Sequence, residues 1–292
     1  MSNTITGHTG LICLLGNPIS HSISPAMHNA SFDYWDLDYT YLAFETSITT
    51  LSSTVETLKN IHARGWNLTM PVKSEMCPLC DTLSSAAKIS NSVNVVVSEN
   101  GILHGHTTDG MGFMRAAKEV GFKTDGGKIT LLGTGGAGTS ILVQAALDGV
   151  SEISVFNRPS ASFNHCRQII ESLHHHTGCK IKLFDYSSPA ILKQEIQSSH
   201  MLVNGTSVGM APNTEACLIP DASYFHKDLI VSDIIYNPRE TKLIKMASAS
   251  GCVTFNGLSM LLYQGAEAFR LWTGKEMPID LIQSKFFHPS CA

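Results

Sequence analysis

The stretch Lys128-Ile-Thr-Leu-Leu-Gly-Thr-Gly-Gly-Ala-Gly138 decides the fold, because it joins a β-branched apolar run to a glycine-rich turn. The turn matches G-x-G-x-x-G, and a run of helical character follows it directly. Glycines allow a tight turn and let an anion approach bare N–H groups at a helix N-terminus. The same glycines could serve a strand-to-helix turn alone, but the flanking strand and helix favour a dinucleotide site. We expect the cofactor to contact Gly133, Gly135, Gly136, Ala137 and Gly138.

The next apolar run, at 153–156, leads into Asn157, Arg158 and Ser160, where a dinucleotide-binding protein usually carries an acid. Such an acid grips the ribose hydroxyls of NAD, whereas an arginine accommodates the 2′-phosphate of NADP. No acid is present, and the planar guanidinium of Arg158 suits a phosphate or the face of adenine. Surface arginines at strand ends are also common without any ligand. We expect these three residues to bind NADP, with NAD as the alternative, and to discriminate weakly between the two.

Apolar runs rich in β-branched residues alternate with segments of helical period along the chain, which predicts an α/β fold of βαβ units with a parallel sheet. Five runs in the second half fit a Rossmann-like, doubly wound dinucleotide-binding domain. We expect an N-terminal α/β substrate-binding catalytic domain over 1–111 and the dinucleotide domain over 112–256. C-terminal helices within 257–292 are expected to pack back on the first domain. Strands are expected at 11–16, 39–44, 66–70, 94–97, 128–132, 153–156, 181–184, 201–204 and 229–233, and helices at 26–35, 49–63, 74–88 and 110–120.

Composition favours small-molecule chemistry. Of 292 residues, 43% are hydrophobic, so the chain can bury the cores of two domains. The formal net charge is −4 without a block of like charges, which gives no reason to expect nucleic acid or an anionic membrane as a partner. The N-terminus lacks a secretory signal pattern, and no apolar run approaches the roughly 20 residues of a membrane span. We expect a cytoplasmic protein, either monomer or homodimer, without nucleic-acid or membrane partners.

Cysteine and histidine spacing gives no metal site. The chain has 8 scattered cysteines, which suit reduced thiols better than a disulfide framework. Only Cys77 and Cys80 have the spacing of a metal or redox pair, and without a second such pair simple packing is favoured. The run His174-His175-His176 is interpreted as a solvated helix end rather than a ligand set.

Two segments of the first domain carry candidate substrate groups. Ser22 and Ser24 follow the first expected strand, where they could hold a carboxylate or only cap the next helix. Lys73 follows the strand that contains Thr69, and Asp109 lies beside the domain junction. A lysine near a carbonyl oxygen can donate a proton, and a Lys–Asp pair is a recognisable acid/base arrangement. The alternative for Lys73 is an ordinary surface lysine.

Together these motifs resemble the shikimate dehydrogenase family in order and over nearly the whole chain. The matching segments are GNPISHSISPAMHN, NLTMPVK, SVN, TTDGMGF, GTGGAG, FNR, NGTSVGM, YNPRET and GLSMLLYQGAEAF. This chain resembles the quinate/shikimate branch of the family more closely than the biosynthetic branch in FNRPSASF, in NGTSVGM and in the ending LLYQGAEAFRLWTGKEMP. The resemblance implies reversible reduction of 3-dehydroshikimate to shikimate with a nicotinamide cofactor, and possible action on quinate and 3-dehydroquinate is left open.

The resemblance also assigns roles. It implies that Lys73 and Asp109 form the catalytic pair and that Ser22 and Ser24 bind the substrate carboxylate. It places Thr69, Asn94 and Gln264 at the substrate hydroxyls, and Tyr236 and Gly257 near substrate and nicotinamide.

This chain departs from the family pattern at Thr107, where Asn is usual, and at Val95, where Thr is usual. Both positions adjoin expected substrate residues, so the choice between shikimate and quinate stays open. A dehydrogenase for a related cyclic hydroxy acid and a non-catalytic module that binds a polyol acid are the alternative functions.

Overall fold

The computed structural model describes residues 4–159 and 161–287, and the chain divides into two compact units. Unit 1 comprises residues 1–108 and 264–292, and unit 2 comprises residues 109–263. The functional domain limits expected from the sequence, 1–111 with 257–292 and 112–256, remain a prediction. Helix α9 (Gly257–Thr273) contributes residues to both units. Within the described residues, no helix combines the length and apolar character that a membrane span requires.

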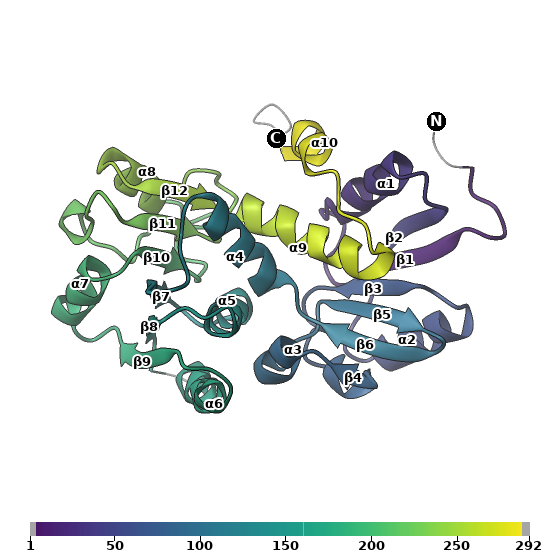
Figure 1. The fold of residues 1–292 in the computed structure, drawn as a ribbon, viewed down its shortest axis with the longest axis horizontal. Coiled ribbons are helices and arrows are strands. Elements are labelled where there is room, and N and C mark those ends of the chain that lie inside the picture. Colours follow the sequence, from purple (N-terminus) through teal and green to yellow (C-terminus); the bar gives the residue numbers. More distant parts are fainter. Residues whose placement is uncertain (1–3, 160, 288–292) are drawn as a thin grey trace. The chain divides into compact units, whose positions relative to one another are not determined.

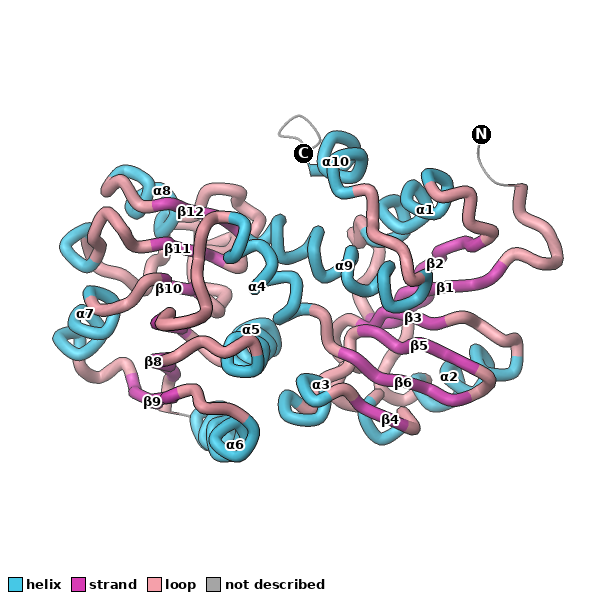
Figure 2. Tube along the Cα trace, in the orientation of Figure 1, coloured by secondary structure: helices cyan, strands magenta, loops and turns pink. Residues whose placement is uncertain are grey.

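Unit 1 contains a mixed sheet in the strand order β2-β1-β3-β5-β6-β4, drawn in magenta in Figure 2. Strand β1 pairs in parallel with β2 and β3, whereas β5 is antiparallel to both β3 and β6. The strands are β1 (Gly10–Gly16), β2 (Tyr39–Glu45), β3 (Gly65–Leu68), β4 (Thr82–Leu83), β5 (Val95–Glu99) and β6 (Ile102–His106).

The expected parallel pairing is present in unit 1 between β1, β2 and β3, but β5 is antiparallel to its neighbours because β5 and β6 form a hairpin. Asn100 and Gly101 connect β5 to β6 with φ values of +53° and +81°. Two positive φ values define the two-residue turn that reverses a strand tightly, and Asn-Gly is the preferred pair for it. Strand β6 was therefore missed although its turn signal is present in the sequence.

The helices of unit 1 follow the expected pattern except between 74 and 88. There, the main chain of Cys80 turns to an extended ψ of 141°, and Asp81 hydrogen-bonds with Leu103 through both its N–H and its side chain, at 2.9 and 2.7 Å. These bonds align the short β4 with β6, so the expected single helix is wrong. The helices are α1 (Ser24–Tyr34), α2 (Leu51–Asn60), η1 (Cys77–Leu79), α3 (Ser85–Ser90), α10 (Ile279–Ile282) and η3 (Gln283–Phe287).

Unit 2 contains a sheet in which the described strands are all parallel, in the order β12-β11-β10-β7-β8-β9, seen from top to bottom in Figure 1. The five expected strands are confirmed, and β12, short and partly exposed, was missed. The strands are β7 (Lys128–Leu132), β8 (Glu152–Asn157), β9 (Lys180–Asp185), β10 (Met201–Asn204), β11 (Ile230–Asp233) and β12 (Val253–Asn256). The helices are α4 (Asp109–Glu119), α5 (Gly136–Leu147), α6 (Ala161–His176), α7 (Pro189–Gln197), η2 (Ala222–Tyr224) and α8 (Lys242–Ala249).

The strand order of unit 2 fixes where a ligand can bind. From β7, the strand order proceeds through β8 to β9 toward one edge of the sheet. From β10, it proceeds through β11 to β12 toward the opposite edge, so the order reverses between β7 and β10. In a doubly wound sheet the loops at this reversal separate at the carboxyl ends of the strands and leave a crevice. The glycine turn follows β7 and therefore lies at this position, which confirms the expected Rossmann-like architecture.

Candidate active site

The loop between β1 and α1 carries the two predicted carboxylate-binding serines. Ser24 is the first residue of α1 and is buried, while Ser22 is half-buried. The Oγ of Ser22 accepts a hydrogen bond from the Ser24 N–H at 3.2 Å. In the described structure, no side chain forms a capping hydrogen bond at the N-terminus of α1. Two hydroxyls at a helix N-terminus, where backbone N–H groups and the helix dipole favour negative charge, suit a carboxylate.

Thr69 follows β3 and lies beside the end of β1. Its N–H donates to the Leu15 carbonyl at 2.9 Å, and the Asn17 N–H donates to the Met70 carbonyl at 2.9 Å. Gly16 has a φ of +153°, and a Cβ at this position would overlap the Thr69 side chain. Glycine therefore lets the segments after β1 and β3 approach each other, which places Thr69 at the same sheet edge as the serine loop.

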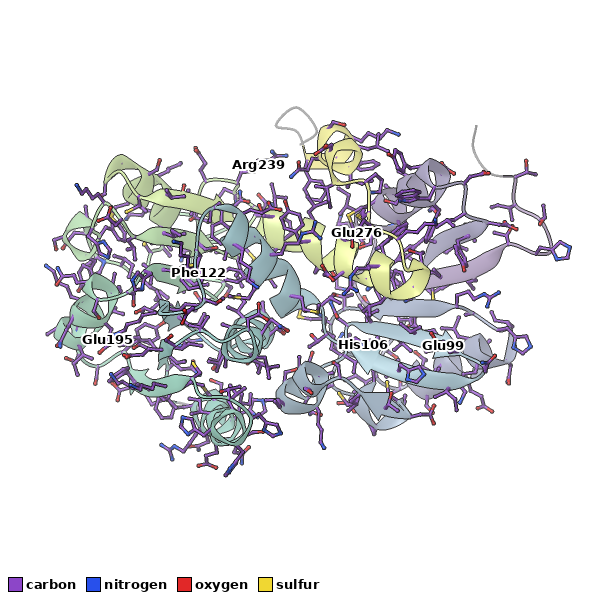
Figure 3. All side chains as sticks on the ribbon, viewed as in Figure 1. Glu99, His106, Phe122, Glu195, Arg239 and Glu276 are labelled. Atoms are coloured by element: carbon purple, nitrogen blue, oxygen red, sulfur yellow. The ribbon has the colours of Figure 1, made fainter. Side chains whose placement is uncertain are left out.

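Buried amide and hydroxyl groups join the ends of β3, β5 and β6. Asn94 Nδ2 donates to Thr108 Oγ1 at 3.1 Å and to Gln264 Oε1 at 3.4 Å, and Asn94 Oδ1 accepts from the Thr108 N–H at 2.8 Å. Asn67 Nδ2 donates to the Asn94 carbonyl at 3.0 Å. The Asn94 N–H donates to the carbonyl of His106, labelled in Figure 3, at 3.0 Å. The structure thus brings together the predicted Asn94 and Gln264.

Asn67 and Thr108 belong to this cluster but were not among the predicted site residues. Asn67 is 6% exposed and Thr108 is fully buried. The signal was present for Asn67, because it stands two residues before Thr69 and the strand period of two places both side chains on one face. Buried polar side chains of this kind need partners, since an unpaired one costs about 1–3 kcal/mol.

The predicted catalytic residues are connected to this cluster in different ways: Lys73 by a main-chain hydrogen bond and Asp109 by its position in the sequence. Lys73 is half-buried, and its carbonyl accepts from the N–H of Val93, the residue before Asn94, at 3.0 Å. Asp109 follows Thr108, is half-buried and is the first residue of α4. Lys73 belongs to unit 1, and Asp109 opens unit 2. An ammonium and a carboxylate are groups able to exchange a proton with a substrate hydroxyl.

The glycine turn has the geometry of an anion cradle. Gly133 has a φ of +85°, and a Cβ on Gly138 would overlap the Gly133 carbonyl oxygen, so the turn requires glycine at both positions. Gly135 caps the 12-residue helix α5 and Gly136 begins it. No described atom lies within 4 Å of the Cβ positions of either residue. Ala137 is half-buried in the first turn of this helix. Open space beside bare backbone at a helix start fits a pyrophosphate.

The end of β8 connects to this turn through side chains. Asn157 is buried, and its Nδ2 donates to Thr134 Oγ1 at 2.6 Å, so it fixes the turn against the strand end. Arg158 is exposed, and its N–H donates to Asn157 Oδ1 at 3.0 Å. Burial raises the pKa of Tyr186, and the Arg158 guanidinium partly offsets this rise. Ser160, also predicted to bind the cofactor, lies outside the described residues.

The loop after β11 carries the predicted Tyr236, and the predicted Gly257, the first residue of α9, donates its N–H to the Ile235 carbonyl of this loop at 3.3 Å. Tyr236 is 52% exposed, and a Cβ on Gly257 would overlap the Ile234 carbonyl oxygen. Asp233, which was not predicted, organises this loop from within. Its carboxylate accepts from Thr241 Oγ1 at 2.7 Å, and from Asn204 Nδ2 and the Ile235 N–H, both at 3.1 Å. The fully buried Asp233 therefore joins the loops after β10 and β11.

Among the described residues, the cysteines and histidines form no metal or catalytic centre. No three His, Cys, Asp or Glu side chains converge on a metal position within 4–159 and 161–287. Cys77 and Cys80 are free thiols, and burial raises the pKa of Cys80 to about 12, which makes it a poor nucleophile. His174, His175 and His176 are the last residues of α6, as expected for a helix end.

The chain is similar to known proteins in both sequence and structure. The family model described as the shikimate dehydrogenase substrate binding domain matches residues 14–96, and that of the shikimate 5'-dehydrogenase C-terminal domain matches residues 257–284. A curated protein of Listeria monocytogenes serotype 4b, named shikimate dehydrogenase (NADP(+)), is 46% identical over 287 residues, which cover 98% of this chain and 99% of that protein.

Two solved structures extend this comparison. The crystal structure of shikimate 5-dehydrogenase from Listeria monocytogenes in complex with shikimate and NAD is 46% identical, with a TM-score of 0.94 and coverage of 97% of this chain and 98% of that one. Quinate dehydrogenase from Corynebacterium glutamicum in complex with NAD is 28% identical, with a TM-score of 0.84 and coverage of 96% and 99%.

Proposed function

Because the chain belongs to the shikimate dehydrogenase family, we propose that it catalyses the reversible reduction of 3-dehydroshikimate to shikimate, with NADP(H) as the preferred cofactor and NAD(H) as a second one. The observation that carries this proposal is 46% identity over 98% of the chain to a protein named shikimate dehydrogenase (NADP(+)). The resemblance found in the sequence motifs is thereby confirmed at the level of the family, and the family is one of enzymes.

Substrate roles are proposed from the chemistry of the groups. The carboxylate of the polyol acid binds to the hydroxyls of Ser22 and Ser24 at the N-terminus of α1. Its hydroxyls pair with side chains that can both donate and accept, since each buried hydroxyl needs a partner. We assign this role to Thr69, Asn94, Gln264 and Tyr236.

Cofactor roles follow from the cradle in unit 2. The open backbone of Gly135 and Gly136 at the start of α5 fits the pyrophosphate, because no described atom fills the space beside them. Ala137 belongs to the same first turn, and Gly133 and Gly138 keep the turn tight. The adenosine end is assigned to Asn157, Arg158 and Ser160, and the nicotinamide end to Gly257.

Lys73 and Asp109 are proposed to move the proton. A nicotinamide cofactor held at the glycine turn would supply a hydride to the ketone carbon, and the ketone oxygen would then gain negative charge. The Lys73 ammonium stabilises this charge and donates the proton that completes the hydroxyl. Asp109 orients the ammonium and accepts a hydrogen bond from the reacting hydroxyl. In the oxidising direction the lysine amine takes the hydroxyl proton back.

Steady-state kinetics with shikimate and quinate, each against NADP and NAD, test this function. Wild-type protein should oxidise shikimate with NADP, and failure with every combination would refute the proposal. Lys73→Ala should lower kcat at least about 100-fold, because positioned acid/base groups contribute about 10²–10⁴-fold. NADP binding, measured by fluorescence, should change less than about twofold, since the lysine acts on the substrate oxygen. Lys88→Ala, at an exposed lysine of α3, is the control, and full activity of Lys73→Ala would refute the role of Lys73 alone.

Quinate is the second candidate substrate. Quinate dehydrogenase from Corynebacterium glutamicum shares the fold over 96% of this chain, and Val95 and Thr107 depart from the family pattern beside Asn94 and Thr108. A kcat/KM for quinate within about tenfold of that for shikimate, a difference of about 1.4 kcal/mol, would support dual use. A dehydrogenase for another cyclic hydroxy acid remains an alternative, whereas the curated relative is named as an enzyme and thus gives no support to a non-catalytic module.

We further propose that the enzyme acts in the cytoplasm as a monomer or homodimer, without nucleic-acid or membrane partners. Light scattering of the purified protein, with and without shikimate, measures the oligomeric state directly.

A further inference from the structure

Tyr41, the third residue of the edge strand β2, is fully buried. The hydroxyl donates to Asn67 Oδ1 at 2.7 Å, and the nearby Ser24 side chain partly offsets the rise that burial causes in the pKa of the phenol. Burial holds the pKa of Tyr41 well above its usual value, so the hydroxyl keeps its proton at neutral pH. The phenol is therefore hydrogen-bonded to Asn67 of β3 and lies near Ser24 of α1.

Helix α1 holds the ring and the main chain of Tyr41. The His28 ring stacks on the Tyr41 ring with centroids 4.7 Å apart and 15° between the planes. The Asn29 side chain binds its main chain, because Nδ2 donates to the Tyr41 carbonyl at 2.9 Å and Oδ1 accepts from the Tyr41 N–H at 2.8 Å. Ring, hydroxyl and main chain are all fixed, so Tyr41 sets the position of the helix whose first residue is Ser24.

Through Asn67, the Tyr41 hydroxyl is also connected to the residues assigned to the substrate hydroxyls. Asn67 accepts from Tyr41 and donates to the Asn94 carbonyl at 3.0 Å. Asn94 in turn hydrogen-bonds with Thr108 and Gln264. Tyr41 thus stands between a residue assigned to the substrate carboxylate and residues assigned to the substrate hydroxyls, all within unit 1.

We propose that Tyr41 is a positioning residue for the substrate, which holds Ser24 and, through Asn67, Asn94 in the arrangement that binds the polyol acid. This inference rests on the proposed function. Tyr41 acts through its neighbours, because its side chain is enclosed by α1 and β3. Removal of the hydroxyl leaves Asn67 Oδ1 without its buried donor, and the Asn67 side chain, which also donates to the Asn94 carbonyl, then turns to other partners.

Tyr41→Phe in the full chain tests the proposal, because it keeps the ring stack and removes only the hydroxyl. The KM for shikimate should rise about tenfold, while kcat at saturating shikimate and the KM for NADP change less than about twofold. The control is Tyr224→Phe, which removes a buried hydroxyl of unit 2 that donates to the Pro189 carbonyl at 3.5 Å. A general loss of stability would appear in both variants, whereas the rise in shikimate KM is expected only in Tyr41→Phe.

A double-mutant cycle shows whether Tyr41 acts through Ser24. In the Ser24→Ala background, Tyr41→Phe should raise the shikimate KM by less than about threefold, because the serine that it positions is gone. Equal rises in both backgrounds would overturn the coupling. Asn29→Ala is a second variant that keeps the hydroxyl but releases the Tyr41 main chain, and it should raise the KM roughly two- to fivefold.

The outcomes separate the two proposals. If wild-type protein oxidises shikimate and neither Tyr41→Phe nor Asn29→Ala changes its KM, the positioning role is refuted. If wild-type protein does not act on shikimate at all, the proposed function fails instead.

Discussion

Arg158 places an exposed cation at the end of β8, next to the buried Asn157 that fixes the glycine turn. We expect Arg158→Ala to raise the KM for NADP about five- to tenfold and to change that for NAD less than about twofold, because only NADP carries a 2′-phosphate for the guanidinium to bind. Initial rates with each cofactor at saturating shikimate measure both constants. Arg167→Ala, at an exposed arginine of α6, is the matched control. Equal losses with both cofactors would show that Arg158 contacts the adenine instead.

His28 makes the stability of unit 1 sensitive to acid. It is fully buried among aromatic rings, and burial lowers its pKa from 6.5 to about 3. Below pH 6.5 the unfolded chain binds a proton that the folded chain does not bind until about pH 3. Each pH unit within this window therefore lowers the free energy of unfolding by about 1.4 kcal/mol.

This linkage predicts a specific difference between variants. Between pH 7 and pH 5, wild-type protein should lose about 2 kcal/mol more stability than His28→Phe, which has no proton to take up at this position. Urea unfolding at the two pH values measures the difference, and replacement of the exposed His8 by Ala serves as the control. Equal losses in wild type and His28→Phe would mean that another group accounts for the acid sensitivity.

At the scale of elements, the glycines at the start of α5 are of two kinds: some are required by the fold, and others leave space that a ligand requires. A Cβ on Gly138 would overlap the Gly133 carbonyl oxygen, so Gly138→Ala should destabilise the protein by about 1–3 kcal/mol. A Cβ on Gly136 meets no described atom within 4 Å, so Gly136→Ala should leave the melting temperature unchanged or higher. The KM of Gly136→Ala for NADP should still rise at least about tenfold, because the methyl group occupies pyrophosphate space.

Thermal unfolding without ligand and NADP kinetics distinguish the two variants. A melting temperature that falls as far in Gly136→Ala as in Gly138→Ala would contradict the open space beside Gly136. Unchanged NADP kinetics in Gly136→Ala would contradict the placement of the pyrophosphate.

Elements were predictable where hydrophobic period and turn chemistry agree. The strand, turn and helix over 128–147 were found because each local signal points to the same structure. The β5–β6 hairpin was missed although Asn100 and Gly101 signal it, because the alternation of strands and helices was extended over the whole chain. The segment 74–88 follows a helical period, but tertiary pairing of β4 with β6 and the hydrogen bonds of Asp81 decide its structure.

At the scale of the whole molecule, the site contains residues whose contact with each other cannot be predicted from the hydrophobic periodicity of the sequence. Asn94 and Gln264 are hydrogen-bonded across 170 positions of sequence, most of which form unit 2. Only the family resemblance placed them together, and their roles toward substrate remain predictions. Tyr41 gave no signal, because a tyrosine in an apolar strand has the pattern of an ordinary core residue. What identifies it is the direction of its hydroxyl, which depends on the packing of α1 against β2.

The division into two units predicts where each ligand protects the chain. The serine loop and the Asn94 cluster belong to unit 1, and the glycine turn belongs to unit 2. Shikimate alone should therefore slow amide exchange in 65–69 and 94–99 without comparable slowing in 133–147, and NADP alone should do the reverse, because a ligand suppresses the opening of the segments that it binds. At 100 times its dissociation constant, a single ligand stabilises the folded state by about 2.7 kcal/mol. Exchange measured by mass spectrometry on wild type and Ser24→Ala tests this, and equal protection of both segments by shikimate alone would contradict it.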